Sequence, residues 1–200
     1  MGVRMTALAV VLGLSSLVAP AQMATGGAGS GPAAGTMVTP AKAVDAQLSL
    51  IESEMMGAVK AMPAEKFGFA PTQAIFVPGQ TTEFATVRTF AQQFTHVAQA
   101  NYYFFMTASG LKPDADVASI AKLTKKEDIV AALAGSFAFG HKAIATLTPA
   151  NAFEVVKIEE PLLMTRGTLA QFSVSHANDH YGQMVEYLRM NGIVPPTSAK

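Results

Sequence analysis

The sequence predicts an all-α protein, an antiparallel four-helix bundle. Four long segments carry apolar residues spaced by three and four, which places those residues on one face of a helix. The segments between them are punctuated by Pro, Gly and Asn, and they contain no convincing series of alternating strands. Helices that each bury one face pack together, so four of them in 200 residues indicate one bundle with one core.

The first predicted helix covers about residues 40–60. Thr39 precedes it and can accept a hydrogen bond from a first-turn amide, while Pro40 suits the first helical position because its missing N–H has no partner there in any case. Apolar side chains at helical spacing predict one buried stripe, which consists of Val44, Leu48, Ile51, Met55 and Val59.

The third predicted helix covers about residues 124–147. Thr124 and Glu127 match a capping box, in which each side chain bonds to the backbone amide of the other residue. Gly135 and Gly140 lower the helix propensity in the middle of this segment. They also leave room for a neighbouring helix to approach closely.

The second and fourth predicted helices cover about residues 82–109 and 162–190. A short extended segment is predicted around 153–158, before the fourth helix. Asn191-Gly192 supplies the C-terminal cap of that helix, because Gly adopts the left-handed backbone conformation that ends many helices. Pro195-Pro196 then prevents the helix from continuing.

The N-terminal region predicts an exported protein. Residues 1–21 combine the positive charge of Arg4, an apolar run and a small-residue cleavage site, which is typical of a secretory signal peptide. A membrane anchor is the alternative, but the apolar run is shorter than the ~20 residues that a span requires. Residues 22–38 read as a flexible linker, 39–196 as the bundle and 197–200 as a tail. We therefore expect a periplasmic or secreted protein with no membrane contact after cleavage.

Composition excludes several functional classes. The 14 basic residues are balanced by 14 acidic ones, so we expect no nucleic-acid partner, because phosphate-binding surfaces carry a basic excess. The chain contains no cysteine. Disulfides, thiolate nucleophiles and cysteine-based zinc sites are therefore excluded.

Two of the four histidines, His176 and His180, lie one helical turn apart on the fourth predicted helix. Their face is partly apolar, since it includes Leu169, Phe172, Gln183 and Tyr187. A buried histidine is more often a hydrogen-bonded core residue than a metal ligand. Two imidazoles at this spacing can nevertheless reach one ion, so both interpretations stay open for the pair.

His96 lies in the middle of the second predicted helix and could complete a set of three imidazoles. Three protein ligands leave a coordination position open, which is typical of catalytic rather than structural sites. Periodicity argues against this set, since His96 lies roughly 160° around the helix from Phe94 in the main apolar stripe. His141, near the end of the third predicted helix, is expected at the surface or facing the helix dipole.

Two stretches resemble the DinB-like superfamily of four-helix proteins, including its secreted bacterial members: "TVRTFAQQFTHVAQANYYFF", and "SHANDHYGQ" followed by "MVEYLRMNGIVPP". The resemblance covers about residues 39–196 and implies the DinB-like type of bundle. It also implies that His96, His176 and His180 bind a divalent metal ion, most commonly zinc or nickel. A homodimer is a further expectation from the family.

The resemblance implies two functional hypotheses. The first is a metal-dependent transferase or hydrolase that acts on a small molecule, for which some relatives use a low-molecular-weight thiol. Asp179 and Glu186 could orient an imidazole or act as a base, although Asp179 would more commonly be a solvated carboxylate. Tyr103 and Gln183 are candidate contacts to substrate or water. The second hypothesis is a non-catalytic metal-binding or structural bundle.

Neither the substrate nor a catalytic residue can be assigned from the sequence. Imidazoles that titrate near ~6.5 must be neutral to coordinate an ion, so the sequence predicts that metal loading falls below about pH 6.

Overall fold

The computed structural model of the chain describes residues 31–75, 77–80, 87–158 and 164–199. The predicted signal peptide 1–21 and linker residues 22–30 lie outside the described residues. Ala34–Lys200 form one compact unit.

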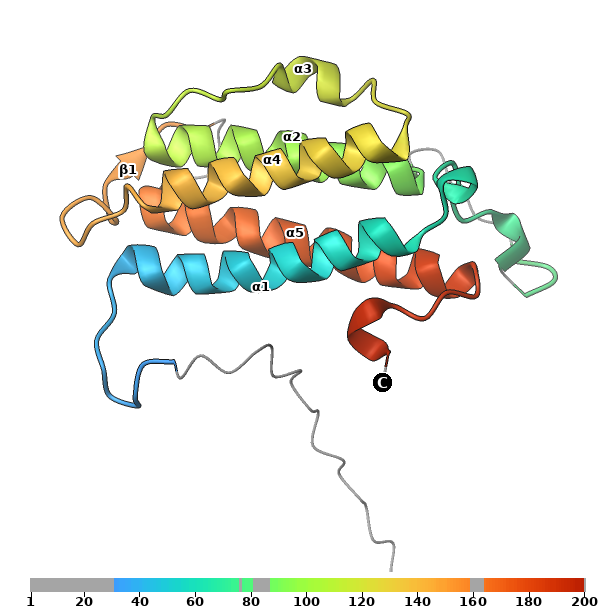
Figure 1. Ribbon diagram of the computed structural model, residues 1–200, viewed down its shortest axis with the longest axis horizontal. Coiled ribbons are helices and arrows are strands. Elements are labelled where there is room, and N and C mark those ends of the chain that lie inside the picture. Colours follow the sequence, from blue (N-terminus) through green and yellow to red (C-terminus); the bar gives the residue numbers. More distant parts are fainter. Residues whose placement is uncertain (1–30, 76, 81–86, 159–163, 200) are drawn as a thin grey trace, which may run out of the picture. The chain divides into compact units, whose positions relative to one another are not determined.

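Among the described residues, four long helices form the bundle, and the predicted all-α class is confirmed (Figure 1). They are α1 (Pro40–Ala61), α2 (Phe90–Ser109), α4 (Lys126–Ile144) and α5 (Arg166–Met190). Both α1 and α2 pack against α4 and α5, so α1 and α2 occupy opposite corners of the bundle. Fully buried side chains from all four helices fill the centre, among them Leu48, Phe94, Phe105, Phe137 and Leu169.

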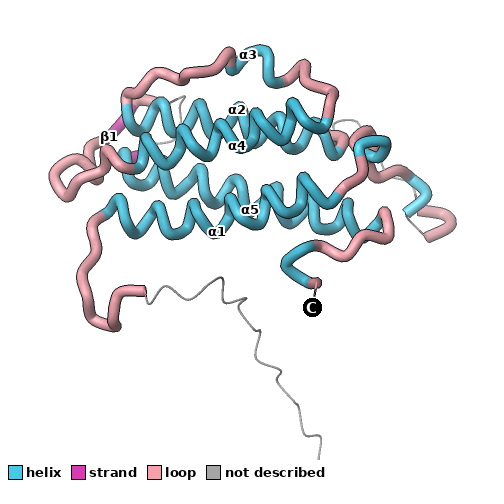
Figure 2. The backbone as a smooth tube through the Cα atoms, in the orientation of Figure 1, coloured by secondary structure: helices cyan, strands magenta, loops and turns pink. Residues whose placement is uncertain are grey.

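The bundle combines antiparallel and parallel neighbours. The Lys126 ammonium, at the start of α4, donates to the carbonyl oxygens of Lys60 and Met62 at the end of α1, so these helices are antiparallel. Arg166, at the start of α5, donates to the Ala108 carbonyl near the end of α2, which makes α2 and α5 antiparallel too. In Figure 2 the segment 110–125, which contains the short helix α3 (Val117–Ile120), returns the chain to the starting end of α2. The neighbours α2 and α4 are therefore parallel.

The first two long helices begin at hydroxyl caps. Thr39 accepts from the Lys42 amide and Pro40 is the first helical residue, as predicted. The predicted start of the second helix near residue 82 is wrong, because residues 87–89 are not helical and 81–86 lie outside the described residues. Thr89 instead caps α2 by a capping box with Gln92. This local exchange of hydrogen bonds sets the first turn of α2.

The capping box predicted at Thr124 and Glu127 is also wrong. The residue before α4 is Lys125, and its side chain makes no capping bond. Contact with the end of α1 through Lys126 fixes the start of α4 instead. The helix ends at Ile144, three residues before the predicted end.

A two-residue β-ribbon precedes α5. Strand β1 (Val155–Val156) pairs antiparallel with β2 (Met164–Thr165), which confirms an extended segment near 153–158 and delays the start of α5 to Arg166. At its other end, Asn191 caps α5 and Gly192 has φ 72°, as the sequence predicts. No helix within the described ranges is both long and apolar enough to cross a membrane.

Candidate metal centre

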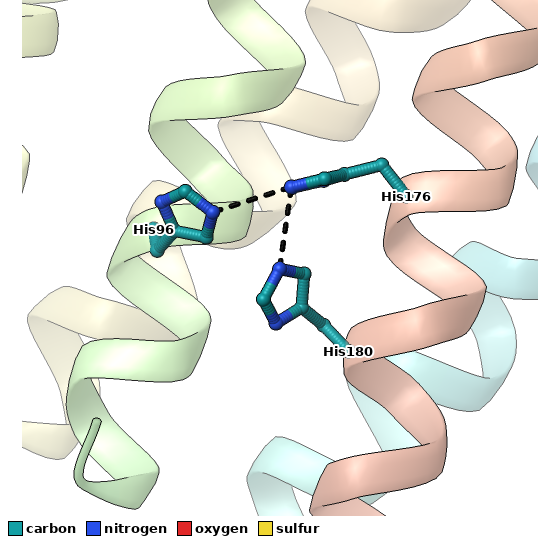
Figure 3. Close-up of side chains that lie close together, drawn as sticks. All are labelled: His96, His176 and His180. Carbon is teal, nitrogen blue, oxygen red and sulfur yellow. Dashed lines mark hydrogen bonds between the residues drawn. The ribbon is translucent and has the colours of Figure 1, made fainter. Parts of the chain in front are cut away.

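Three imidazoles from two neighbouring helices converge in the bundle (Figure 3). The Nε2 atom of His176 lies 3.2 Å from Nε2 of His96 and 3.2 Å from Nε2 of His180. The ligand atoms of all three rings lie within 4.8 Å of one another. The structure thus brings together the three histidines that the sequence singles out, over a separation of 80 residues between His96 and His176.

His96 reaches the site because α2 packs on two sides. Phe94 and Val97 are fully buried, in agreement with the apolar stripe that the sequence predicts. The adjacent face, which includes Gln93 and His96, lies against α5 and contacts His180 and His176 there. Periodicity predicts only the apolar stripe, because it gives no signal for a second buried face made of polar residues.

The spacing of the three Nε2 atoms suits one small cation. Nitrogen atoms bound to a tetrahedral Zn²⁺ ion at about 2.0–2.1 Å lie about 3.3 Å apart. Two of the three separations here are 3.2 Å. Three converging lone pairs repel one another unless a proton or a cation lies among them, so the donor set fits a divalent ion.

A chain of hydrogen bonds fixes the protonation of His180. The Gln183 amide nitrogen donates to Asp179 at 3.0 Å, and the Gln93 amide nitrogen donates to the Gln183 amide oxygen at 2.8 Å. The Gln93 amide oxygen lies 2.6 Å from Nδ1 of the buried His180 ring, so it accepts from that nitrogen. The proton of the neutral ring is thereby held on Nδ1, and the lone pair on Nε2 points at the other two rings.

His176 lies in apolar surroundings. Its ring centroid is 5.5 Å from that of Phe104 and 6.5 Å from that of Phe172. Its Nδ1 atom is buried and has no hydrogen-bond partner within the described part of the chain. Because such an atom costs free energy, its presence beside two other imidazoles is an indication of a functional rather than a packing role.

Burial keeps all three rings neutral. Desolvation lowers the pKa of His96 to about 4, and the positive charges of Arg88 and of a protonated His176 add to this effect. It also lowers the pKa of His180 to about 4 and shifts the pKa of His176 downward, although Asp179 partly opposes both shifts. Neutral imidazole is the form that binds metal, so the site is in its binding form at neutral pH.

A pocket of about 370 Å³ borders the site at His96. Its walls come from the start of α2 and from the segment after α3, and they consist of Val87, Arg88, Gln92, Thr95, His96, Gln99 and Ala121. The volume lies within the range of small-molecule sites.

Among the other candidates, Asp179 has the solvated position that the sequence favours for it. Asp179 is exposed and reaches His180 only through the two amides of Gln183 and Gln93. Glu186 is exposed and pairs with Arg189 at 2.7 Å. The ring of Tyr103 is 40% exposed and packs against Phe104. Gln183 contacts the site as a link in the amide chain.

His141 was expected at the surface or facing the helix dipole, and that interpretation is incomplete. It is half-buried in the last turn of α4, with Nδ1 2.5 Å from Asp45 and Nε2 2.9 Å from Glu52, both on α1. Burial opposes the charge of the ring, but hydrogen bonds to the two carboxylates outweigh it and raise the pKa of His141. This residue joins two helices and is separate from the three-histidine site.

Two residues of the site were missed from the sequence. Gln93 precedes His96 by three residues, so both lie on the same helical face, and this spacing was the available signal. Arg88 lies just before the helix, where periodicity carries no information about side-chain direction.

Comparison with known proteins agrees with this architecture. A family model described as the DinB superfamily matches residues 47–184. A similar solved structure is the crystal structure of a DinB-like protein from Bacillus cereus ATCC 10987, with a TM-score of 0.61 and 15% sequence identity over 78% of this chain and 95% of that one. At this identity the likeness shows the fold alone. No curated protein gives a significant match.

Proposed function

We propose that this chain, which belongs to the DinB superfamily, binds one divalent metal ion through His96, His176 and His180. The observation that carries the proposal is the convergence of three Nε2 atoms, with two separations of 3.2 Å. The lowered pKa values support it, and so does the buried Nδ1 of His176, which has no hydrogen-bond partner among the described residues. Zinc and nickel are the ions that we propose, since imidazole nitrogen suits both.

The proposed activity is a metal-dependent transferase or hydrolase reaction on a small molecule. An ion with three protein ligands keeps a position for water or a thiol, whose pKa it lowers toward neutrality. The chain itself contributes orientation and exclusion of water. Gln93 holds the Nδ1 proton of His180, and the rings of Phe104 and Phe172 cover His176.

A non-catalytic metal-binding or structural bundle is the second candidate, and one observation favours it. Asp179, the carboxylate connected to the site, is separated from His180 by two amide side chains. It is therefore poorly placed to take a proton directly from a bound water. In this candidate the ion would link α2 to α5 and stabilise the bundle.

The predicted signal peptide supports a location outside the cytoplasm, and we propose a periplasmic or secreted protein that acts there on a small molecule. A thiol is one candidate substrate, since thiolate sulfur is a good ligand for zinc. A homodimer remains a proposal from the family resemblance.

Elemental analysis of the purified full chain and of a variant with His96, His176 and His180 all changed to alanine tests the proposed site. We expect about one ion per chain in the parent protein and none in the triple variant. The matched control is His141→Ala, which removes a histidine outside the site and should keep the ion. Equal occupancy in the parent and the triple variant would show that the site assignment is wrong.

Spectroscopy separates the two candidates. With cobalt(II) in the site, an exchangeable position predicts that added thiols change the absorption spectrum, because a thiolate replaces water at the ion. A spectrum that is insensitive to thiols and to small anions would favour the non-catalytic bundle.

A further inference from the structure

We infer that the three-histidine centre accepts a small carboxylate-bearing molecule, and that the Arg88 guanidinium binds the carboxylate in the pocket beside His96. This inference rests on the proposed metal site and adds the chemical class of its ligand. Its basis is the position of one cation on the wall of the pocket that borders the site.

The pocket joins a metal-ligating group to a cationic one. His96 and Arg88 both line the same cavity of about 370 Å³. The other lining groups are apolar or neutral, and no carboxylate is among the described residues that form the walls. A ligand in this cavity therefore meets a positive charge that the walls themselves do not neutralise.

The backbone of Arg88 is held in place by α5. The hydroxyl of the buried Tyr187 donates to the Arg88 carbonyl oxygen at 3.1 Å. The next residue, Thr89, caps α2 through its bonds with Gln92. The side chain of Arg88 thus starts from a fixed point between α2 and α5, the two helices that carry the histidines.

The first amides of α2 do not compete for the carboxylate. Phe90 N–H donates to the Phe69 carbonyl at 2.8 Å, Ala91 N–H to the Phe67 carbonyl at 2.9 Å, and Gln92 N–H to the Thr89 hydroxyl at 3.2 Å. The guanidinium is consequently the group in this region that can form a charge-assisted, two-point contact with a carboxylate. Removing it should remove the preference for an anion.

The test uses two probes of nearly equal shape, mercaptoacetate and its neutral amide, mercaptoacetamide. Each is titrated into the cobalt-loaded full chain, and its dissociation constant is read from the thiolate-to-cobalt absorption band. The same titrations are made with Arg88→Gln and with the control Lys112→Gln, which removes one positive charge beyond the other end of α2. The measured quantity is the ratio of the two dissociation constants.

We expect Arg88→Gln to reduce the preference for mercaptoacetate about tenfold, the usual size of a hydrogen bond to a charged group. Lys112→Gln should leave the ratio unchanged. An equal ratio in the parent protein and in Arg88→Gln would overturn the inference, and so would an equal loss in both variants, which would indicate a general effect of net charge.

Metal content, measured on the same samples, separates this inference from the proposed function. If the parent protein takes up no stoichiometric ion, the metal site itself fails and the inference fails with it. If the ion binds in parent and variants but the ratio is insensitive to Arg88, the metal site stands and only the carboxylate assignment fails.

Discussion

The Nδ1 atom of His180 and the side-chain oxygen of Gln93 lie 2.6 Å apart, and the direction of this hydrogen bond is fixed by the other half of the same amide. The Gln93 amide nitrogen donates a hydrogen bond to the Gln183 amide oxygen, and the Gln183 amide nitrogen donates to the Asp179 carboxylate. Each amide can satisfy both contacts in one orientation only. A surface carboxylate thereby determines which nitrogen of a buried ring carries the proton.

Replacing Gln93 by leucine should weaken metal binding by about 10- to 100-fold, the usual cost of losing a group that orients a histidine ligand. The variant removes the acceptor for the His180 Nδ1 proton and keeps a side chain of similar size. Competition titration with a chelating dye measures the affinity. Gln171→Leu is the matched control on the exposed face of α5, and it should bind metal like the parent protein. Parent-like affinity in Gln93→Leu would show that the amide chain has no influence on the site.

Metal binding should persist to lower pH than ordinary histidines allow. Burial lowers the pKa of His96 and of His180 to about 4, so these rings stay neutral as the pH falls through the ordinary histidine range near ~6.5. Protons therefore compete with the ion only at more acidic pH, and the expectation from the sequence that loading falls below about pH 6 is revised downward. Zinc titrations at pH 7, 6 and 5, with circular dichroism to verify folding, provide the measurement. Half-loss of binding near pH 6.5 would contradict this prediction.

His141→Gln should destabilise the protein more at pH 5.5 than at pH 9. Both ring nitrogens face carboxylates, Asp45 and Glu52, and the net effect of these contacts is a raised pKa in the folded chain. The stabilisation is complete below the unfolded pKa near ~6.5 and is lost as the pH rises through the folded value. Urea unfolding at both pH values measures the loss.

Lys142→Gln is a suitable control for the histidine variant. The hydrogen bond from Lys142 lowers the pKa of Asp114, so this carboxylate is charged at both pH values, and the small effect of losing the exposed ion pair should be equal at both. A pH-independent loss for His141→Gln would mean that the histidine contributes packing rather than charge.

Gly140→Ala should lower the free energy of unfolding by about 1–3 kcal/mol, the usual cost of overpacking a core. A Cβ at this position would lie 2.6 Å from one ring carbon of Phe105 and 3.1 Å from a methyl carbon of Leu48. Gly182→Ala on α5 meets no atom within 4 Å and should stabilise the helix by up to about 1 kcal/mol. Urea denaturation of both variants measures the contrast. A neutral effect of Gly140→Ala would imply that α4 can shift away from its neighbours at little cost.

The sequence predicts those features that depend on nearby residues. The Thr39 cap and the Asn191-Gly192 end are local, and both are confirmed. The start of α4 was predicted wrongly because Lys126 bonds to the end of α1, a contact between residues more than sixty positions apart. Local patterns contain no information about such a partner.

In the candidate site, too, the sequence predicts what depends on nearby residues and not what depends on contacts between helices. The one-turn spacing of His176 and His180 identifies a shared face from the sequence alone. The orientation of His96 toward α5 depends on how α2 is rotated between two neighbours, and periodicity favoured another direction. The family resemblance supplied that assignment. The carboxylate partners of His141 on α1 could not be predicted, since nothing in the sequence pairs α1 with α4.

The separation of 80 residues between His96 and His176 has a consequence for folding. An extended or partly folded chain offers an ion no more than the pair on α5, so the complete donor set arises only after α2 has docked. An ion held by all three rings would cross-link α2 to α5, and it would oppose every fluctuation that separates these helices. The rate at which the ion is released would then report how often α2 and α5 separate.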